Sequence, residues 1–511
     1  MIYEKKKTAV GAGRRLKYLG RTLVVLQIIA VLIVSVRMAF MNILPAGYMI
    51  ACIIAMLTVC ALLWLATGKK VFTLVVIIVS LLMICLLFHA FAAMNRLDDT
   101  LKRVSSDDGQ ETVQMAVITL ADASANELTD CGGSKIGCIR NDITVPGVKK
   151  VIDDANAFPA VYTEYDDVLT LAEALLNGME NVIILNREYI DMISEQDNYT
   201  GFSEKVKILY VLEVNVPVSG AETKSGGKAE TEPGMKGDGQ ESYMLSYDEK
   251  TIVIYVSGID TFGSINVKSR SDVNILIALN METGQMQLIN TPRDYYVILP
   301  GKGADKLTHG GLYGVECSKE VLENLYGITI DYYLRINFSG FEDIIDLMGG
   351  IDVFSAYDFT VEPIRHYTVG YNHLSGIEAL AFARERYSFA EGDVQRGTNQ
   401  MEVIKAVISK AASADILVNY QELLEEVSEC FQTDMPPEVI YDLVRYQLSN
   451  NVTWKIDSFT VRGTGSHETT YSIPGTTSYV MLPDNDDVAE ARRLIENVMA
   501  GDMLPTDKAG N

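Results

Sequence analysis

The fold of the carboxyl-terminal half is decided by residues 251–293, which read TIVIYVSGIDTFGSINVKSRSDVNILIALNMETGQMQLINTPR. Residues 251–258 and 273–280 are apolar runs rich in β-forming residues, and a third run, 285–291, follows the second after the turn 281–284. Two such runs joined by a short turn are typical of a β-hairpin. We therefore expect three neighbouring strands in one sheet.

Charged residues stand at the ends of these strands. If the hairpin strands pair directly across their turn, antiparallel register places Asp272 opposite Arg293. An antiparallel return of the first strand would also bring Asp260 beside Asp272. Together with Arg270, two carboxylates and two arginines would meet at one sheet edge. Carboxylates can hold Mg²⁺ (or Mn²⁺) and arginines can bind phosphate, so we expect Asp260 and Asp272 as metal ligands beside a phosphate site.

The residues after the hairpin alternate between helical and strand patterns. Ser375 and Glu378 have capping-box spacing, which predicts a helix running toward Arg384, with Arg386 just beyond its end. This alternation predicts an α/β fold in which a mixed central sheet is covered by helices. Helices are expected at residues 316–325, 340–347, 376–383, 394–412 and 487–499.

The predicted helix 394–412 carries charge on its apolar face. At 100° per residue, Arg396 and Gln400 fall within the stripe of apolar side chains rather than opposite it. A core-facing arginine needs an anionic partner, because an uncompensated buried charge costs several kcal/mol. That partner could be a protein carboxylate or a bound phosphate. Asp393 could orient Arg396, cap the helix or act as a base, and ordinary salt bridges remain the alternative for each arginine.

The first part of the chain has the composition of a membrane anchor. Three nearly uncharged runs, 23–44, 46–66 and 71–94, are each about as long as a helix that crosses a bilayer. Seven basic residues precede the first run and two lie between the second and third. By the positive-inside rule, 1–21 is a cytoplasmic basic tail, 22–95 is a three-helix anchor, and the rest of the chain is extracellular. A cleaved signal peptide would show one short apolar run instead.

The extracellular part divides by composition. A polar stalk, a small α/β accessory domain, a flexible linker rich in Gly, Ser, Glu and Lys, and the catalytic domain are expected at 96–111, 112–218, 219–242 and 243–511. The accessory domain shows no catalytic pattern and is interpreted as a spacer or a partner-binding module. Its Cys131 and Cys138 are close enough in sequence to form a small-loop disulfide, an open question at this level.

The charge balance restricts the partners. Outside the anchor the chain carries 33 basic and 66 acidic residues, a balance of −33. Such a surface is a poor general binder of nucleic acid or acidic polymers. Any polyanion must therefore be captured at the local cluster of arginines.

Several of these blocks, in this order and behind a membrane anchor, strongly resemble the LytR-CpsA-Psr family of bacterial envelope proteins. The resemblance covers residue 242 to the carboxyl terminus, and the blocks are SRSDVNILIALN, INTPRDYYV, DKLTHGG, INFSGFEDIIDLMGGIDV, LSGIEALAFARER and GDVQRGTNQ. It implies a protein that binds a polyprenyl-diphosphate-linked glycopolymer at the outer membrane face. It further implies transfer of the glycosyl phosphate to peptidoglycan, with a phosphodiester formed and polyprenyl phosphate released.

The resemblance also implies roles for individual residues. Asp260 and Asp272 would hold Mg²⁺, and Asp393 would assist the attacking hydroxyl. The implied catalytic residues are Arg293, Arg384, Arg386, Asp393 and Arg396. The implied substrate-binding residues are Arg270, Arg293, Lys306, Arg384, Arg386, Arg396 and Gln400. His309, in the same Gly-rich turn as Lys306, is expected to be structural. Asn399 stands where many members have a further arginine, which puts one phosphate contact in doubt.

Two other functions fit the same residues. A polyprenyl-diphosphate hydrolase would need the same arginines, with water in place of the sugar hydroxyl. A noncatalytic envelope-binding or regulatory protein would need only the binding site. Cytoplasmic DNA binding is disfavoured, because only the short basic tail lies inside. The apolar residues of 273–279 and 341–348 could line a slot for the lipid or belong to the core.

Overall fold

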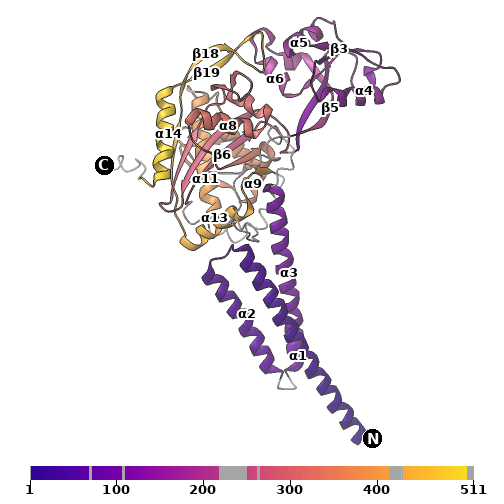
Figure 1. Cartoon of the computed structure of the whole chain (residues 1–511), viewed down its shortest axis with the longest axis vertical. Coiled ribbons are helices and arrows are strands. Elements are labelled where there is room, and N and C mark those ends of the chain that lie inside the picture. The colour runs from indigo at the N-terminus through magenta and orange to yellow at the C-terminus, as the bar shows by residue number, and fades with distance from the viewer. Residues whose placement is uncertain are drawn as a thin grey trace, which may run out of the picture. The chain divides into compact units, whose positions relative to one another are not determined.

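The computed structural model forms two units along the chain (Figure 1). The first comprises Met1–Ser105, Ala411–Ser428 and Met435–Thr453, and the second comprises Ser106–Lys410, Glu429–Asp434 and Trp454–Asn511. The structure describes residues 2–67, 72–105, 110–217, 250–261, 265–390, 392–413, 427 and 430–502, with side chains from residue 15 onward. The expected linker 219–242 lies outside the described residues.

The first unit contains three long helices, α1 (Ile2–Met41), α2 (Ala46–Ala66) and α3 (Thr73–Ser105). Each is long and apolar enough to cross a membrane, as the three apolar runs predicted. α3 continues through the first part of the expected stalk, because residues 95–105 contain no Gly or Pro that would end it.

A helix from far along the chain also belongs to the first unit. α13 (Pro437–Asn450) buries Tyr441 against Leu97 and Leu101 of α3, and the side chain of Arg445 donates a hydrogen bond to the backbone oxygen of Asn42 at 2.8 Å. The sequence pattern gave no sign that residues 411–428 and 435–453 would group with the anchor rather than with the rest of the expected catalytic domain.

The second unit begins with the accessory lobe. Its five strands have the order β3-β2-β4-β1-β5, with β1 antiparallel to β4 and β5 and with β2 parallel to β3 and β4. The strands are β1 (Gln110–Leu120), β2 (Lys135–Ile139), β3 (Val161–Tyr165), β4 (Val182–Asn186) and β5 (Val206–Pro217). The helices are α4 (Val145–Ala155), α5 (Val168–Leu176), α6 (Glu188–Ser194) and α7 (Phe202–Lys205).

The two cysteines of this lobe are free thiols. Cys131 and Cys138 are both fully buried in the core on one side of the sheet. Burial raises the pKa of Cys131 to about 11, so the reactive thiolate is scarce at neutral pH. The structure thus contains two separate buried thiols at these positions.

The catalytic domain is built on a six-stranded mixed sheet of order β16-β11-β6-β7-β8-β17. The strands are β6 (Thr251–Ile259), β7 (Ser271–Asn280), β8 (Gln285–Asn290), β11 (Tyr332–Asn337), β16 (Phe431–Thr433) and β17 (Lys455–Thr460). The predicted hairpin is confirmed, since Asn280 pairs with Gln285 across the turn. β11 pairs in parallel with β6, and β17 pairs in parallel with β8, whereas β7 is antiparallel to both β6 and β8. The sheet is therefore mixed, as predicted.

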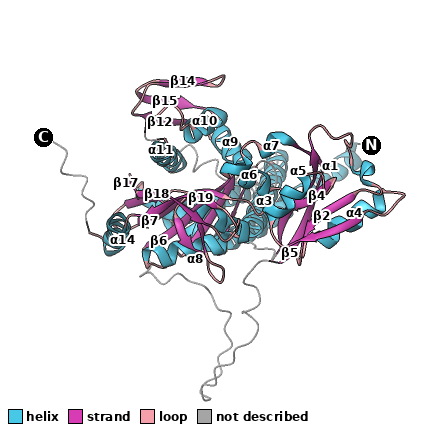
Figure 2. Ribbon diagram, turned by 90° about the horizontal axis from the view of Figure 1, so that it is seen from above, coloured by secondary structure: helices cyan, strands magenta, loops and turns pink. Residues whose placement is uncertain are grey.

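Helices cover both faces of this sheet (Figure 2). One face packs on α8 (Val315–Tyr326) and α14 (Asn485–Ala500), and the other packs on α11 (Asp393–Ala411). α9 (Phe338–Leu347) and α10 (Gly376–Arg384) lie next to each other, and all five helices were predicted. Short strands complete the domain: β9 (Tyr296–Ile298), β10 (Ala304–Lys306), β12 (Ile351–Ser355), β13 (Phe359–Val361), β14 (Arg365–Tyr367), β15 (Gly370–Leu374), β18 (Gly463–Thr469) and β19 (Thr477–Pro483).

A glycine sets the geometry where β6 ends. The register between β6 and β7 shifts between Gly258 and Ile259, and a Cβ at Gly258 would lie 2.7 Å from the Cβ of Val273. Only glycine allows the strands to approach this closely. The irregularity leaves Asp260 level with the first residues of β7, where Asp272 lies.

Candidate active site

One cavity of about 710 Å³ gathers most of the charged residues singled out in the sequence. Asp260 and Asp272, all five arginines and Gln400 line it, although they come from five separate stretches of chain. The complete lining is Asp191, Ser194, Glu195, Ser203, Asp260, Arg270, Asp272, Arg293, Phe338, Arg384, Arg386, Tyr387, Arg396 and Gln400. The convergence expected from strand register and helix periodicity is therefore observed.

The aspartate that the hairpin register placed opposite Arg293 forms an ion pair with it. Nη1 of Arg293 donates to Oδ2 of Asp272 at 2.8 Å, and the hydroxyl of Thr308 donates to Oδ1 at 2.9 Å. Burial alone would raise the pKa of Asp272, but the positive charges of Arg293, Arg270 and Arg396 outweigh it and hold the pKa below its ordinary value. Asp272 is thus ionised at neutral pH.

The second aspartate behaves differently. Burial and the negative charge of Asp272 together raise the pKa of Asp260 above its ordinary value, although Arg270, Arg384 and Arg293 oppose the shift. Nη2 of Arg270 lies 3.7 Å from Asp260, and that of Arg384 lies 3.9 Å away, so neither contact is a close hydrogen bond. A divalent cation between the two carboxylates would relieve their repulsion.

Two arginines come from the end of α10. The capping box predicted at Ser375 is present and fixes the start of this helix, with the Ser375 amide donating to Glu378 at 2.9 Å. Arg384, in its last turn, is 52% exposed and lies over the ring of Phe338 at 4.3 Å. Arg386 follows in the next loop and donates to the Tyr387 hydroxyl at 2.6 Å. Both arginines therefore line the cavity, Arg384 from an exposed side chain and Arg386 from a half-buried one.

α11 supplies the last predicted residues. Arg396 and Gln400 line the cavity from the same helix whose Val403 and Ile404 line an apolar cavity farther along, as the stripe predicted. Asp393 is the first residue of α11, but its side chain lies outside those that the structure describes. Asn399 is buried and hydrogen-bonds to Gln395, and it is not among the cavity-lining residues.

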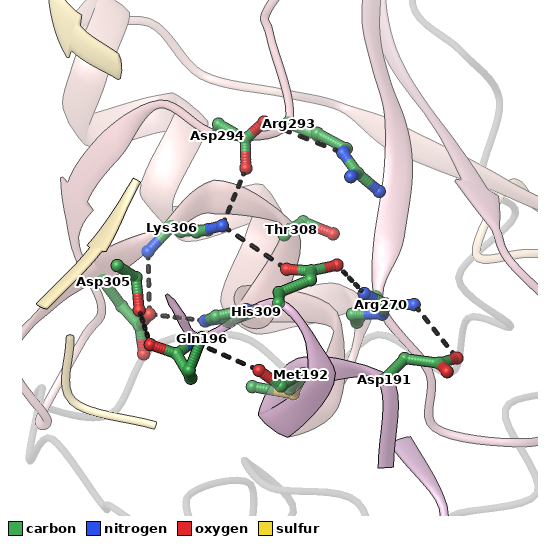
Figure 3. A network of polar contacts seen from close by, with 12 residues as sticks. Asp191, Met192, Gln196, Arg270, Arg293, Asp294, Asp305, Lys306, Thr308 and His309 are labelled. Atoms are coloured by element: carbon green, nitrogen blue, oxygen red, sulfur yellow. Dashed lines mark hydrogen bonds and ion pairs between the residues drawn. The ribbon is translucent and has the colours of Figure 1, made fainter. Parts of the chain in front are cut away.

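Lys306 and His309 are paired with carboxylates and do not line the cavity; Figure 3 shows Lys306 beside Asp294 and His309 beside Asp305. Nζ of Lys306 lies 3.1 Å from Asp294, and the side chain is only 6% exposed. Nδ1 of His309 lies 2.6 Å from Asp305, and the imidazole is buried, which agrees with the structural role expected for it. Neither side chain lines the cavity, so Lys306 would need to move before it could contact a ligand there.

Sequence reasoning missed the contribution of the accessory lobe. Four residues of α6, α7 and the turn after α6 line the charged cavity: Asp191, Ser194, Glu195 and Ser203. Nη1 of Arg270 donates to Glu195 at 2.8 Å. The helix α6 is seven residues long, and nothing in its composition indicates that it contacts residues some eighty positions away. The lobe is thus more than a spacer.

An apolar cavity of about 360 Å³ adjoins the charged one. Residues of β7 and α9 line it, including Ile277, Phe341 and Ile344, which the sequence left undecided between lipid slot and core. The opposite wall belongs to α11, with Val403, Ile404, Val407 and Ile408. The two cavities share Phe338, Arg384 and Gln400.

The chain is similar to curated proteins and to solved structures. It is 35% identical over 207 residues to the Bacillus cereus polyisoprenyl-teichoic acid–peptidoglycan teichoic acid transferase TagU, a match covering 40% of this chain and 67% of the relative. An Enterococcus faecalis protein of the same name is 34% identical over 185 residues, covering 36% of this chain and 61% of the relative. The crystal structure of Bacillus subtilis TagV is 27% identical with a TM-score of 0.42, over 50% of this chain and 98% of that one.

The family comparison reaches farther along the chain. The LytR_cpsA_psr family model matches residues 174–488, which begin inside α5 of the accessory lobe and include every described strand of the central sheet. The match therefore starts well before residue 242, where the resemblance read from the sequence began. This chain belongs to the LytR-CpsA-Psr family.

Proposed function

We propose that this protein transfers a glycosyl phosphate from a polyprenyl-diphosphate-linked glycopolymer to peptidoglycan. One observation carries the proposal: a cavity lined by five arginines adjoins an apolar cavity, and the two share Arg384. A lipid-linked donor needs both surroundings, because its diphosphate is charged and its chain is apolar. The names of the Bacillus cereus and Enterococcus faecalis relatives, both teichoic acid transferases, support the choice of donor and acceptor.

The arginines would supply most of the catalysis. In the reaction, the acceptor hydroxyl oxygen bonds to the phosphorus of the glycosyl phosphate, and the bond from that phosphorus to the bridging oxygen breaks. Polyprenyl phosphate leaves with the electron pair, and the proton of the hydroxyl passes to a base, for which Asp393 is the candidate. Arg293, Arg384 and Arg396 would stabilise the charge that develops on the phosphate oxygens.

Asp260 and Asp272 fit a Mg²⁺ or Mn²⁺ ion bound together with the donor. Within the described residues, no group of three or more His, Cys, Asp or Glu side chains is arranged to hold a metal. Mg²⁺, however, is commonly held by one or two carboxylates together with water and substrate phosphates. The raised pKa of Asp260 indicates a carboxyl whose ionisation would be favoured by such an ion. When bound, the ion would neutralise phosphate charge shared with the arginines.

The proposed location is the outer face of the cell membrane. α1, α2 and α3 are long and apolar enough to anchor the chain. The basic residues in the first part of α1, ahead of its apolar stretch, favour a cytoplasmic amino terminus, and three spans would then place the cavity outside. A lipid-linked donor and peptidoglycan are both available there, whereas the acidic exterior disfavours nucleic acid as a partner.

The test is transfer by the full chain reconstituted in membranes with a defined lipid-linked donor and peptidoglycan. Arg384→Ala should abolish phosphodiester formation. Arg492→Ala is the control and should retain it, because the side chain of Arg492, on α14, is 51% exposed, close to the 52% of Arg384. Release of polyprenyl phosphate and free glycosyl phosphate without coupling would indicate the hydrolase instead. Binding of donor without either product would indicate a noncatalytic protein.

A further inference from the structure

The accessory lobe pairs its carboxylates with an arginine of the charged cavity. The guanidinium of Arg270 is only 6% exposed, and each of its three nitrogens faces an acid of α6 or of the turn that follows it. Nη1 lies 2.8 Å from Glu195, Nε lies 3.5 Å from Glu188, and Nη2 lies 3.7 Å from Asp191. Figure 3 shows Asp191 on its helix beside Arg270. The shortest of these contacts is a charge-assisted hydrogen bond, with which a phosphate oxygen would have to compete.

Glu195 holds a second cation at the same time. Its Oε1 accepts from Arg270, and its Oε2 lies 3.5 Å from Nζ of Lys306. One carboxylate therefore bridges two of the residues that the family resemblance assigns to diphosphate binding. Glu195 also lines the cavity itself, together with Asp191, so two negative charges from the accessory lobe face the space that an anionic donor would enter.

The accessory lobe is fixed firmly enough for these charges to be a permanent part of the cavity. Glu111 of β1 forms a 2.6 Å ion pair with Lys268, and both side chains are 6% exposed. The backbone of Thr112 exchanges two hydrogen bonds with the chain just before β7, at 2.9 and 2.7 Å. Gln196, next to Glu195, accepts a hydrogen bond from Ser478 at 2.9 Å. Moving the accessory lobe away from Arg270 would break these contacts, which opposes such a movement.

We propose that Glu195 sets the anion affinity of the active site by withholding Arg270 and Lys306 from the donor's diphosphate. The inference rests on the proposed function and assigns to the accessory lobe a role in that site. The diphosphate is then held chiefly by Arg293, Arg384, Arg386 and Arg396. With fewer positive charges available to bind phosphate, the site also releases its product more readily, because the product polyprenyl phosphate keeps one of the donor's two phosphates.

The experiment is calorimetric titration of the full chain in detergent with inorganic pyrophosphate at a fixed Mg²⁺ concentration. Glu195→Gln keeps the shape of the side chain and removes its charge, so pyrophosphate should bind about tenfold more tightly. Glu204→Gln is the matched control, since Glu204 is an exposed carboxylate of α7 that does not line the cavity. It should leave the affinity unchanged. Adding Arg270→Gln to Glu195→Gln should remove the gain, because the gain depends on the arginine that was set free.

Affinity of Glu195→Gln equal to or weaker than that of the wild type would overturn the proposal. If that variant fails to fold, Asp191→Asn decides in its place, because Asp191 faces the same guanidinium from a 64% exposed position. A smaller gain in affinity would support the proposal, and no gain would contradict it. Two further measurements test the proposed function separately from this inference. If the wild type binds no pyrophosphate, or if Arg384→Ala binds pyrophosphate as tightly as the wild type does, the proposed function is wrong.

Discussion

Closing the apolar cavity should weaken binding of the lipid without weakening binding of the diphosphate. Val407 lines this cavity from α11 but does not line the charged one, so Val407→Trp changes only the apolar part of the site. The indole should fill roughly the space of one isoprene unit in a cavity of about 360 Å³. The lipid chain would then lose one unit of buried surface.

The magnitude follows from the area removed from water. Burying the roughly five carbons of an isoprene unit contributes about 4 kcal/mol at about 0.8 kcal/mol per CH₂, an upper limit because this value assumes complete burial of the unit. An upper limit of about 4 kcal/mol corresponds to roughly a thousandfold in Kd. We expect farnesyl diphosphate to bind between about tenfold and about a thousandfold more weakly to Val407→Trp, and inorganic pyrophosphate to bind as to the wild type.

The assay is calorimetric titration of each protein with both ligands, so that the ratio of the two Kd values isolates the contribution of the chain. Ser409→Trp is the control, because Ser409 is exposed on the same helix and does not line the cavity. Unchanged affinity of Val407→Trp for farnesyl diphosphate would show that the lipid lies elsewhere. Equal loss of pyrophosphate binding would show that the substitution disturbs the charged cavity.

Three further substitutions test the electrostatics and packing of the site by thermal unfolding of the full chain. Asp272→Asn removes the carboxylate from its 2.8 Å pair with Arg293 and should cost up to about 3 kcal/mol at pH 7. Since the pKa of Asp272 is depressed, its stabilisation is full above about pH 4, near the ordinary pKa of an aspartate, and is lost only as the pH falls below that value. The difference in stability should therefore narrow between about pH 4 and about pH 2, and an equal difference at about pH 7 and about pH 2 would count against this. Asp260→Asn should instead raise the Tm by a few degrees at pH 7 without Mg²⁺. The pKa of Asp260 is raised, so its ionisation above that pKa destabilises the fold, and asparagine cannot ionise. A lower Tm would contradict the raised pKa of Asp260. Gly311→Ala should destabilise the fold by roughly 3 kcal/mol, since the added Cβ would overlap the backbone where β7 begins. Gly147→Ala in α4 is the control, because its Cβ would meet open space and should leave the Tm unchanged or higher. Similar Tm values for the two variants would refute the close packing at Gly311.

The parts of the site that follow from local rules could be predicted from the sequence. The hairpin turn sets the register that pairs Asp272 with Arg293, and the capping box sets where α10 begins and hence where Arg384 lies. Helical periodicity placed Arg396 on the core-facing side of α11, beside the charged cavity. In each case the relevant residues lie within about one strand pair or one helix, so spacing along the chain determines their position in space.

The parts that depend on docking between distant segments could not be predicted. Glu195 reaches Arg270 because the accessory lobe packs on the catalytic domain, and the short helix before it has no periodicity that would indicate a buried face. The grouping of α13 with the anchor depends on side chains such as Tyr441, whose partners on α3 are more than three hundred residues away. Surface carboxylates in an acidic chain give no sign of which of them will meet an arginine.

The central claim is that the charged cavity holds the diphosphate of a polyprenyl donor and the apolar cavity holds its chain. The most direct test is a crystal structure of the chain with a bound prenyl diphosphate. The account predicts both phosphates within hydrogen-bonding distance of Arg384 and Arg396, and the chain between α9 and α11. Phosphates bound away from these arginines, or a lipid chain bound outside the space between these helices, would contradict it.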